Sequence, residues 1–289
     1  AWDLQLEDTI SAKIESWMKG QNAPMRALEI AKLGSDLPFD LAMERERNEF
    51  LTLRTQPQAR ALRHMFFAER AAKLPNDIGN QPAEVKNICV VGGGTMGAGI
   101  AYACISAGYQ VILLEEDEDG IERARLNVSK LIQEGVNRGI LDQGRVDVLE
   151  TKISYSHDYA SASNSDLVIE AAFENMDLKK SIFSKLDQHV PEHTILATNT
   201  SYLDVNDIAG STRNPGRIVG LHFFAPAHIM KLLEIVRGTE TNDRALSTAY
   251  TIAKKLRKVP VLAGVCDGFI GNRILARYRE AADTILMDA

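Results

Sequence analysis

The sequence predicts an α/β protein, with a Rossmann-like, doubly wound and mostly parallel sheet preceded by an all-helical N-terminal segment. Three observations predict this fold. Apolar residues keep a helical spacing up to about residue 74, short apolar runs alternate with helical patterns from Val85 onward, and a glycine-rich turn joins the first run to a helix. Such alternation places helices on both faces of a sheet whose ligands lie beyond the carboxyl ends of the strands.

The N-terminal segment predicts four helices and no strand. Apolar residues recur at helical intervals over residues 8–18, 24–33, 40–54 and 58–73. The stretch from Leu74 to Pro82 contains two prolines and a glycine, and we expect it to be a linker. We therefore expect a helical region at 1–84, a nucleotide-binding domain at 85–266, and the start of a further helical domain at 267–289.

The chain after the linker predicts eight strands and a series of helices. The strands are expected at residues 88–91, 110–114, 152–155, 166–172, 194–198, 217–222, 232–236 and 259–262. The helices are expected directly after the glycine turn, at 120–138 and 176–189, from 204, at 243–256 and from 267. Polar residues at the ends of these strands are the candidates for chemistry.

The glycine turn is the most specific local pattern. The apolar run Ile88–Val91 leads into Gly92-x-Gly94-x-x-Gly97 and then into an alanine-rich helical stretch. The first glycine permits a sharp turn, the second removes a side chain that would block a pyrophosphate, and the third lets the helix lie close to the strand. The helix N-terminus then presents free N–H groups to phosphate. This context favours a dinucleotide site over an ordinary βαβ unit with a glycine turn.

An acidic run follows the second predicted strand and indicates which dinucleotide binds. Glu115 stands at the strand end, where a carboxylate can bind the adenosine ribose hydroxyls, and Glu116–Asp119 extend the negative charge. A 2′-phosphate would meet like charge there, with no arginine nearby. The sequence therefore favours NAD over NADP, and Asp117–Asp119 are expected to be solvated.

Composition excludes several other classes of protein. The chain has 289 residues, 45% of them hydrophobic, a net charge of −6 and no Lys/Arg stripe, which argues against a nucleic-acid or membrane-surface partner. No apolar run approaches the length of a membrane span, and the N-terminus is not a signal peptide. The three cysteines are far apart and predict buried core residues, not a metal site or a disulfide. They are Cys89, Cys104 and Cys266.

A histidine and a glutamate are candidates for proton transfer. His222 ends a predicted strand, and Glu234 lies twelve residues later in an otherwise apolar strand, where a carboxylate is costly to bury without a partner. If the two strands are neighbours, Glu234 can bond the far imidazole nitrogen and fix the tautomer. A structural role for His222 is the alternative. His228 is a rival histidine that follows a proline turn and is expected at the surface.

Other polar residues have both a structural and a functional interpretation. Asn199 and Ser201 end a strand, where they can cap the next helix or hold a substrate oxygen. Asn272 lies within a predicted helix, an unfavourable place for Asn that invites a reason. Glu174 can cap a helix or contact a nicotinamide ribose.

Residues 85–289 resemble the L-3-hydroxyacyl-CoA dehydrogenases. Several separate motifs agree in order and spacing, which makes the resemblance specific. The motifs are Val91–Ala101 (VGGGTMGAGIA), Ile169–Asn175 (IEAAFEN), Ala197–Ser201 (ATNTS), Gly220–Phe224 (GLHFF), Met230–Ile235 (MKLLEI) and Asp267–Arg273 (DGFIGNR).

The resemblance implies NAD-dependent oxidation of 3-hydroxyacyl-CoA to 3-oxoacyl-CoA and a role for each matching residue. His222 would be the catalytic acid/base with Glu234 as its partner, and Ser201 and Asn272 would bind the substrate's 3-oxygen. Ala225 stands where many relatives have Asn, so one polar contact to the cofactor is absent. The implied NAD-binding residues are Gly92, Gly94, Thr95, Met96, Gly97, Glu115, Ala172, Phe173, Glu174, Lys179, Asn199 and Ser201.

Residues 25–74 resemble the end of a crotonase-type enoyl-CoA hydratase/isomerase domain and the helix that links it to the dehydrogenase. The stretch Ala59–Arg70 is typical of multifunctional fatty-acid β-oxidation enzymes. The chain begins without Met and stops at Ala289 inside a helical pattern, so we expect a central fragment of such an enzyme. The resemblance implies an acyl-CoA substrate, a thiolase subunit and a homodimer partner for the whole enzyme. Bacterial cytoplasm is the expected location, with the peroxisome as the alternative.

Two other functions are also compatible with the sequence. The fragment could bind NAD without turnover, because helices that complete the acyl site would be missing. It could also be a Rossmann dehydrogenase of the 3-hydroxyisobutyrate or 6-phosphogluconate type, which share a similar glycine turn but use a lysine as proton carrier; the His222–Glu234 pair speaks against this. We expect no hydratase activity, since the crotonase body is absent from the sequence.

Overall fold

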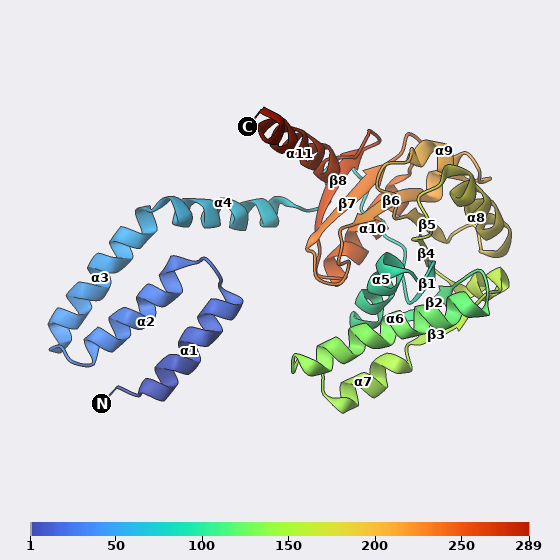
Figure 1. Cartoon of the computed structure of the whole chain (residues 1–289). Helices are drawn as coiled ribbons and strands as arrows, with labels where there is room; N and C mark the ends of the chain where they lie inside the picture. Colours follow the sequence, from blue (N-terminus) through green and yellow to red (C-terminus); the bar gives the residue numbers. More distant parts are fainter. Residues whose placement is uncertain (1, 289) are drawn as a thin grey trace. The chain divides into compact units, whose positions relative to one another are not determined.

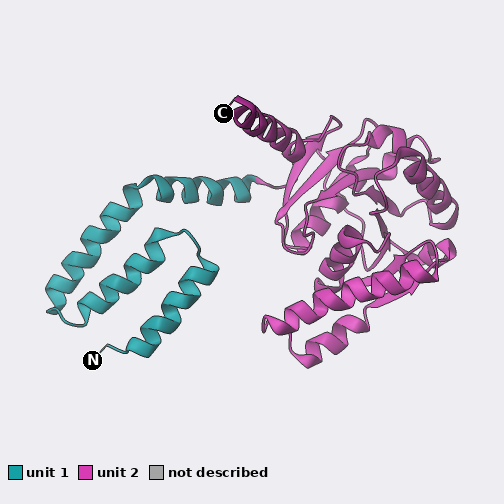
Figure 2. Ribbon diagram, viewed as in Figure 1, with its two compact units in different colours: residues 1–71 teal, residues 72–289 magenta. Residues whose placement is uncertain are grey.

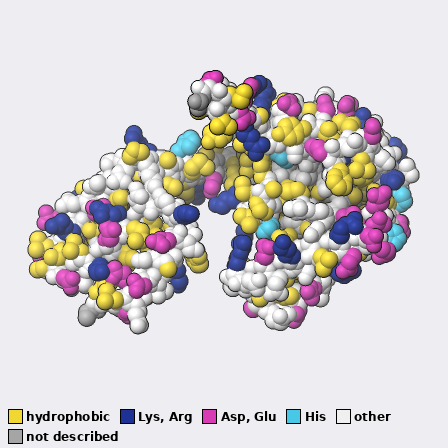
Figure 3. Space-filling view, viewed as in Figure 1, with side chains coloured by type: hydrophobic (Ala, Val, Ile, Leu, Met, Phe, Trp, Pro, Cys, Tyr) yellow, Lys and Arg dark blue, Asp and Glu magenta, His cyan; other side chains and the backbone are white. Residues whose placement is uncertain are grey.

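The computed structural model describes residues 2–288, which divide into two compact units at the boundary between Ala71 and Ala72 (Figure 2). The first unit contains helices α1 (Leu4–Trp17), α2 (Asn22–Gly34), α3 (Phe39–Thr55) and α4 (Pro57–Ala71), as the apolar spacing predicts. Each helix packs on the next in the chain, yet no residue of these four helices is buried. Hydrophobic side chains accordingly remain on the visible surface of this unit (Figure 3).

The second unit is built on an eight-stranded sheet in the order β3-β2-β1-β4-β5-β6-β7-β8 (Figure 1). All neighbours pair in parallel except β6 and β7, which are antiparallel. The predicted doubly wound, mostly parallel sheet is therefore confirmed. The strands are β1 (Asn87–Val91), β2 (Gln110–Leu114), β3 (Ile153–Ser156), β4 (Leu167–Glu170), β5 (Ile195–Thr198), β6 (Ile218–Phe223), β7 (Leu232–Arg237) and β8 (Val259–Gly264).

Helices cover both faces of this sheet and create two hydrophobic cores. The first core packs one face against α5 (Thr95–Ser106), α6 (Glu118–Asn137), α7 (Gln143–Glu150) and α10 (Asp243–Lys255). The second core packs the other face against α8 (Met176–His189) and α9 (Val205–Ala209). Apolar runs form strands here because both of their faces are buried.

The order of strands places a switch point between β1 and β4. The chain winds outward from β1 through β2 to β3 in one direction and through β4, β5 and β6 in the other. Loops that leave β1 and β4 therefore diverge at the carboxyl edge, which opens a crevice where doubly wound sheets bind ligands. The glycine turn follows β1 at this crevice.

Several element boundaries differ from the sequence predictions. The helix expected from Asp267 is α11 (Gly271–Asp288), because Gly268 and Phe269 have positive φ angles of 66° and 49° and cannot continue a helix. The expected strand at 166–172 ends at Glu170. Helix α7 and two short 3₁₀ helices, η1 (Tyr159–Asn164) and η2 (Pro215–Arg217), were not predicted.

The segment expected to be a linker packs on the second unit. Ile78 is buried in the first core, and Gly79 N–H donates to Asp243 at 2.8 Å. Ala83 N–H donates to the Thr248 hydroxyl, also at 2.8 Å. Because these residues have no secondary structure of their own, side chains of α10 satisfy their backbone donors.

Candidate active site

The glycine turn after β1 is shaped by close backbone packing. Gly92 has φ of +95°, in the left-handed region that glycine adopts without strain. A Cβ added to Gly97 would lie 1.7 Å from the Gly92 carbonyl oxygen, so only glycine lets α5 begin this close to the strand. A Cβ added to Gly94 would meet no protein atom within 4 Å. Protein packing does not demand glycine at 94, whereas a pyrophosphate approaching the N-terminus of α5 does.

We expect substitution by alanine to impair cofactor binding at Gly94 but stability at Gly97. Gly94→Ala should fold normally, since its φ of −64° suits alanine, but should bind NADH about tenfold or more weakly because the methyl group stands in the phosphate cradle. Gly97→Ala should lower the free energy of unfolding by about 1–3 kcal/mol, as overpacking does. Calorimetry with NADH and urea unfolding measure the two effects. Undiminished NADH affinity in Gly94→Ala would contradict the cradle.

Glu115 lies directly beside this turn. It follows β2, is half-buried, and its carboxylate accepts a hydrogen bond from the Gly93 N–H group. The sequence-predicted ribose ligand thus stands at the phosphate turn with no arginine or lysine bonded to its carboxylate among residues 2–288. These residues fit a dinucleotide with free ribose hydroxyls.

Antiparallel pairing of β6 and β7 brings His222 and Glu234 together. The two residues are direct register partners, and their side chains meet with Nδ1 2.7 Å from the Glu234 Oε2 atom. The side chains are only 4% and 1% exposed. Alternation along β6 puts Phe223 in the first core, so His222 faces the other side of the sheet, beside Phe269 of the second core.

The second carboxylate oxygen of Glu234 is also engaged. It accepts hydrogen bonds from the backbone N–H groups of Ile270 at 3.1 Å and Gly271 at 2.7 Å, at the start of α11. A buried carboxylate with three donors has its desolvation offset. The Nε2 atom of His222 makes no hydrogen bond within the described residues, nor is it among the fully buried polar atoms that lack a partner. The imidazole is therefore held at Nδ1 and available at Nε2.

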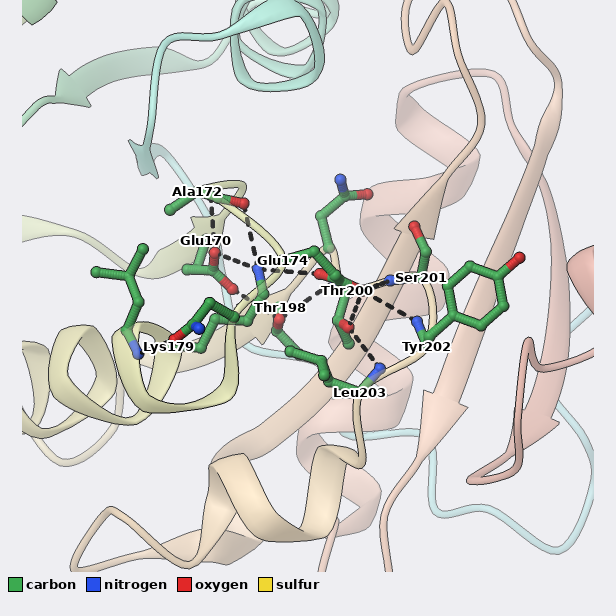
Figure 4. Close-up of polar contacts among 12 residues, drawn as sticks. Glu170, Ala172, Glu174, Lys179, Thr198, Thr200, Ser201, Tyr202 and Leu203 are labelled. Atoms are coloured by element: carbon green, nitrogen blue, oxygen red, sulfur yellow. Dashed lines mark hydrogen bonds and ion pairs between the residues drawn. The ribbon is translucent and has the colours of Figure 1, made fainter.

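The strand ends of β4 and β5 are joined by a polar network centred on Glu174 (Figure 4). Its Oε1 atom accepts hydrogen bonds from the Thr200 hydroxyl at 2.6 Å and from the backbone N–H groups of Ser201 and Tyr202 at 2.7 and 3.0 Å. Burial opposes the charged form of Glu174, but these bonds and the Lys179 ammonium outweigh it and lower the pKa of the carboxyl. A fixed negative charge thus orders the loop that carries Ser201.

A deeper ion pair supports this network. Glu170, fully buried at the end of β4, accepts from the Lys179 ammonium at 2.6 Å, from Ala172 N–H at 2.7 Å and from the Thr198 hydroxyl at 2.7 Å. Lys179 is itself 1% exposed and also lies 3.5 Å from Glu174. The network therefore ties the loop after β4 to both the end of β5 and helix α8.

Replacing Glu174 by Gln should destabilise the protein in a pH-dependent way. The lowered pKa means that the carboxylate stabilises the fold above its ordinary value of 4.5, and that this contribution is lost as pH falls through the lowered value. We expect Glu174→Gln to lower the free energy of unfolding by about 1 kcal/mol near pH 7. Hydrogen bonds to a charged group contribute more than this when buried, but Glu174 is partly exposed. The difference from wild type should shrink on acidification. Urea midpoints at several pH values measure this difference in stability, and Glu192→Gln at an exposed position is the control. A difference that does not change with pH would contradict a stabilising role for the Glu174 charge.

The remaining predicted residues lie at the same edge of the sheet and differ in whether their side chains are hydrogen-bonded or exposed. The Asn199 side chain accepts from the Phe223 N–H group at 2.8 Å and so links the ends of β5 and β6. The Ser201 and Asn272 side chains make no hydrogen bond within residues 2–288. Phe173 is 85% exposed beside the half-buried Ala172. Thr95 and Met96 open α5, and Ala225 is exposed just after β6.

Sequence reasoning missed several residues that build this edge. A Cβ added to Gly93 would lie 2.2 Å from the Ala124 Cβ atom, and the Gly93 carbonyl accepts from the Asn127 amide at 2.9 Å, so the middle of the turn is fixed against α6. Glu170 and Thr198 were also missed. A glutamate that ends the apolar run LVIE carries the same signal as Glu234, a charge in a buried strand.

The fold and this edge define a dinucleotide-binding oxidoreductase domain, with a glycine turn after β1, an acidic residue after β2 and a histidine–carboxylate pair on β6 and β7. Residues 87–266 match the family model described as "3-hydroxyacyl-CoA dehydrogenase, NAD binding domain". The chain belongs to this family, and its cofactor is NAD.

Comparisons with individual proteins agree with the family match. The chain is 37% identical over 276 residues to the peroxisomal fatty acid beta-oxidation multifunctional protein MFP2 of Arabidopsis thaliana, covering 94% of this chain and 38% of that protein. FadB2 of M. tuberculosis superposes with a TM-score of 0.70 at 31% identity, covering 71% of this chain and 73% of that one. The 3-hydroxybutyryl-CoA dehydrogenase of Escherichia coli gives 0.69 at 35%, covering 71% and 44%. The chain thus spans well under half of the multifunctional relative.

Proposed function

We propose that this chain is the dehydrogenase region of a multifunctional fatty-acid β-oxidation enzyme and that it oxidises 3-hydroxyacyl-CoA to 3-oxoacyl-CoA with NAD. The buried His222–Glu234 pair at the carboxyl edge of an NAD-binding sheet carries this proposal. The multifunctional relative from Arabidopsis, aligned over nearly the whole chain, supports the wider assignment.

The geometry of the pair supports proton transfer at Nε2. With Nδ1–H donated to Glu234, the Nε2 lone pair can accept the proton of a substrate 3-hydroxyl. Glu234 then stabilises the imidazolium and keeps the ring from rotating, because its other oxygen is fixed by two backbone donors. Positioned proton transfer of this kind contributes about 10²–10⁴-fold in rate.

The substrate and cofactor contacts are proposed residue by residue from the family motifs. Ser201 and Asn272 would hold the 3-oxygen, which suits two polar side chains that the protein does not itself bond. Bound NAD would accept the hydride released from C3 of the substrate. Holding these groups in order is the contribution of the proposed cofactor residues, namely Gly92, Gly94, Thr95, Met96, Gly97, Glu115, Ala172, Phe173, Glu174, Lys179, Asn199 and Ser201.

A second candidate is a chain that binds NAD without turning over substrate. Helix α11, which carries Asn272, has no buried residue, and Ile274 and Tyr278 on it are 66% and 72% exposed. An acyl site that depends on this helix would be poorly fixed in such a chain. The lysine-dependent alternative has less support, because Lys179 is committed to Glu170 and to the Ala172 carbonyl.

Binding and turnover measured side by side distinguish these candidates. Calorimetry with NADH, followed by the absorbance decrease of NADH with acetoacetyl-CoA, should give both binding and a rate under the leading proposal. Binding without a rate would favour the second candidate. Absence of NADH binding would refute both.

Partners and location of the whole enzyme rest on the resemblance. A thiolase subunit and a second copy of the chain are the proposed partners. We propose the bacterial cytoplasm as its location, with the peroxisome named for the Arabidopsis relative as the alternative. Among the described helices, none has the length and apolar character needed to cross a bilayer.

A further inference from the structure

A basic cavity lies on the opposite face of the sheet from the His222 imidazole. It encloses about 570 Å³ between the second half of α5, the start of α7, the loop after β6 and the turn from α10 to β8. That volume is in the range of small-molecule sites and far exceeds a single phosphate. Among residues 2–288 no Asp or Glu lines it, although the chain carries a net charge of −6. Its five cationic lining residues are Arg145, Lys231, Lys255, Arg257 and Lys258.

Arg257 is the least expected of these residues. Its N–H bonds to the Lys254 carbonyl at 3.0 Å, and the Lys258 N–H bonds to the Ala253 carbonyl at 2.8 Å. This pair of bonds ends α10 in a Schellman motif, whose left-handed position strongly favours glycine. Arg257 occupies that position with φ of +57°, and its guanidinium has no hydrogen bond or ion pair within residues 2–288. A strained backbone therefore carries a cation that no described residue of the chain neutralises.

The floor of the cavity is also short of negative charge. The Lys258 ammonium is buried, and within the described part of the chain it bonds only to the carbonyls of Ala227 and Met230; burial lowers its pKa. The Nδ1 atom of His228 is fully buried and has no hydrogen-bond partner among the residues that the structure describes. Burial lowers the pKa of His228, and the negative charge of Glu134 on α6 partly opposes this shift, but Glu134 does not line the cavity.

Apolar and aromatic side chains complete the lining. Tyr102 stacks edge-on against His228, with ring centroids 5.5 Å apart, and Ala103, Ala107 and Leu256 add apolar wall. A site with several cations and an apolar wall suits a ligand that combines phosphates with an organic body. Simple counter-ions from solution do not need such a wall.

We propose that this cavity binds an organic ligand carrying two or more phosphate groups, at a site separate from the glycine turn and from His222. Free nucleoside triphosphate and coenzyme A share this chemistry. Arg257 and Lys255 would grip the phosphates at the rim, while Tyr102 and Leu256 would contact the organic body.

Arg257→Gly tests the proposal without a folding penalty, because glycine relieves the left-handed backbone while removing the guanidinium. The chain is titrated by calorimetry with ATP and, separately, with coenzyme A. We expect one of them to bind, more weakly as salt rises, and about tenfold more weakly in Arg257→Gly. Lys254→Gln is the matched control, since this neighbouring lysine lies outside the lining, and it should bind like wild type.

The two ligands identify the source of the phosphates. Weaker ATP binding in Arg257→Gly assigns the cavity to a free nucleotide. Weaker coenzyme A binding in this variant assigns the cavity to the coenzyme A moiety of an acyl-CoA thioester. No measurable binding of either ligand, or equal binding to wild type, Arg257→Gly and Lys254→Gln, would overturn the proposal. Binding at the glycine turn would give that equal result, so the two sites are not confused.

Discussion

Replacing His222 by Gln should lower the rate of acetoacetyl-CoA reduction by about 10²–10⁴-fold while leaving NADH affinity nearly unchanged. Gln keeps polar contact with Glu234 but has no nitrogen that exchanges a proton near neutral pH. The side chain is 4% exposed and lies outside the glycine turn, so cofactor binding should not depend on it. The measurement is the initial rate of NADH oxidation in the whole enzyme, with calorimetry for NADH.

The control for this prediction is His193→Gln. His193 is exposed, and its side chain makes no hydrogen bond within the described residues, so the rate should stay at the wild-type value. A His222→Gln enzyme that retains full activity would remove the proton-transfer role from this residue. It would leave the NAD-binding assignment intact, because that rests on the family match and the glycine turn.

Replacing Lys179 by Met should cost about 3–5 kcal/mol of unfolding free energy, the largest stability effect that we expect in this chain. Met has a similar length, but it leaves the Glu170 carboxylate charged and fully buried. Within residues 2–288, its remaining donors would be only the Ala172 N–H and the Thr198 hydroxyl. Because these groups order the loops after β4 and β5, NADH affinity should fall as well. Urea unfolding with amide exchange of β4 and β5 measures the loss.

Two companion variants locate the cause of that loss. Lys180→Met alters the neighbouring lysine of α8, which is half-buried and has no ion pair among the described residues, and should cost less than about 1 kcal/mol. Adding Glu170→Gln to Lys179→Met removes the stranded charge and should restore much of the stability. If the double variant is as unstable as the single one, lost packing and not an unpaired charge is responsible.

Local patterns in the sequence were sufficient for most elements of the fold. Helix α8 and strand β2 fall at their predicted residues, because apolar periodicity and flanking caps are encoded over a few positions. The glycine turn was also predictable, since Gly92 and Gly97 meet steric requirements of the nearby backbone and Gly94 leaves room for a pyrophosphate. Predicted boundaries were wrong where a turn sets the end of an element. At Phe269, for example, a left-handed φ delays the start of α11.

Contacts between distant residues were less predictable. Spacing indicated that a carboxylate in the run KLLEI needs a partner, and it named His222 on the condition that the two strands are neighbours. It could not indicate that β7 turns antiparallel to β6, which makes the residues register partners. Nor could it indicate that Lys179 lies buried against Glu170 across a loop.

The sequence by itself determined the α/β class, the glycine turn and the residue types available for chemistry, because burial pattern and backbone sterics act over short stretches of chain. Only the tertiary structure decided which polar groups meet. Examples are the bonds of Glu234 to His222 and the Gly271 N–H, the bond from the Thr200 hydroxyl to Glu174, and the group of cations around Arg257. Those encounters depend on strand order and register, which are fixed by packing between residues far apart in sequence.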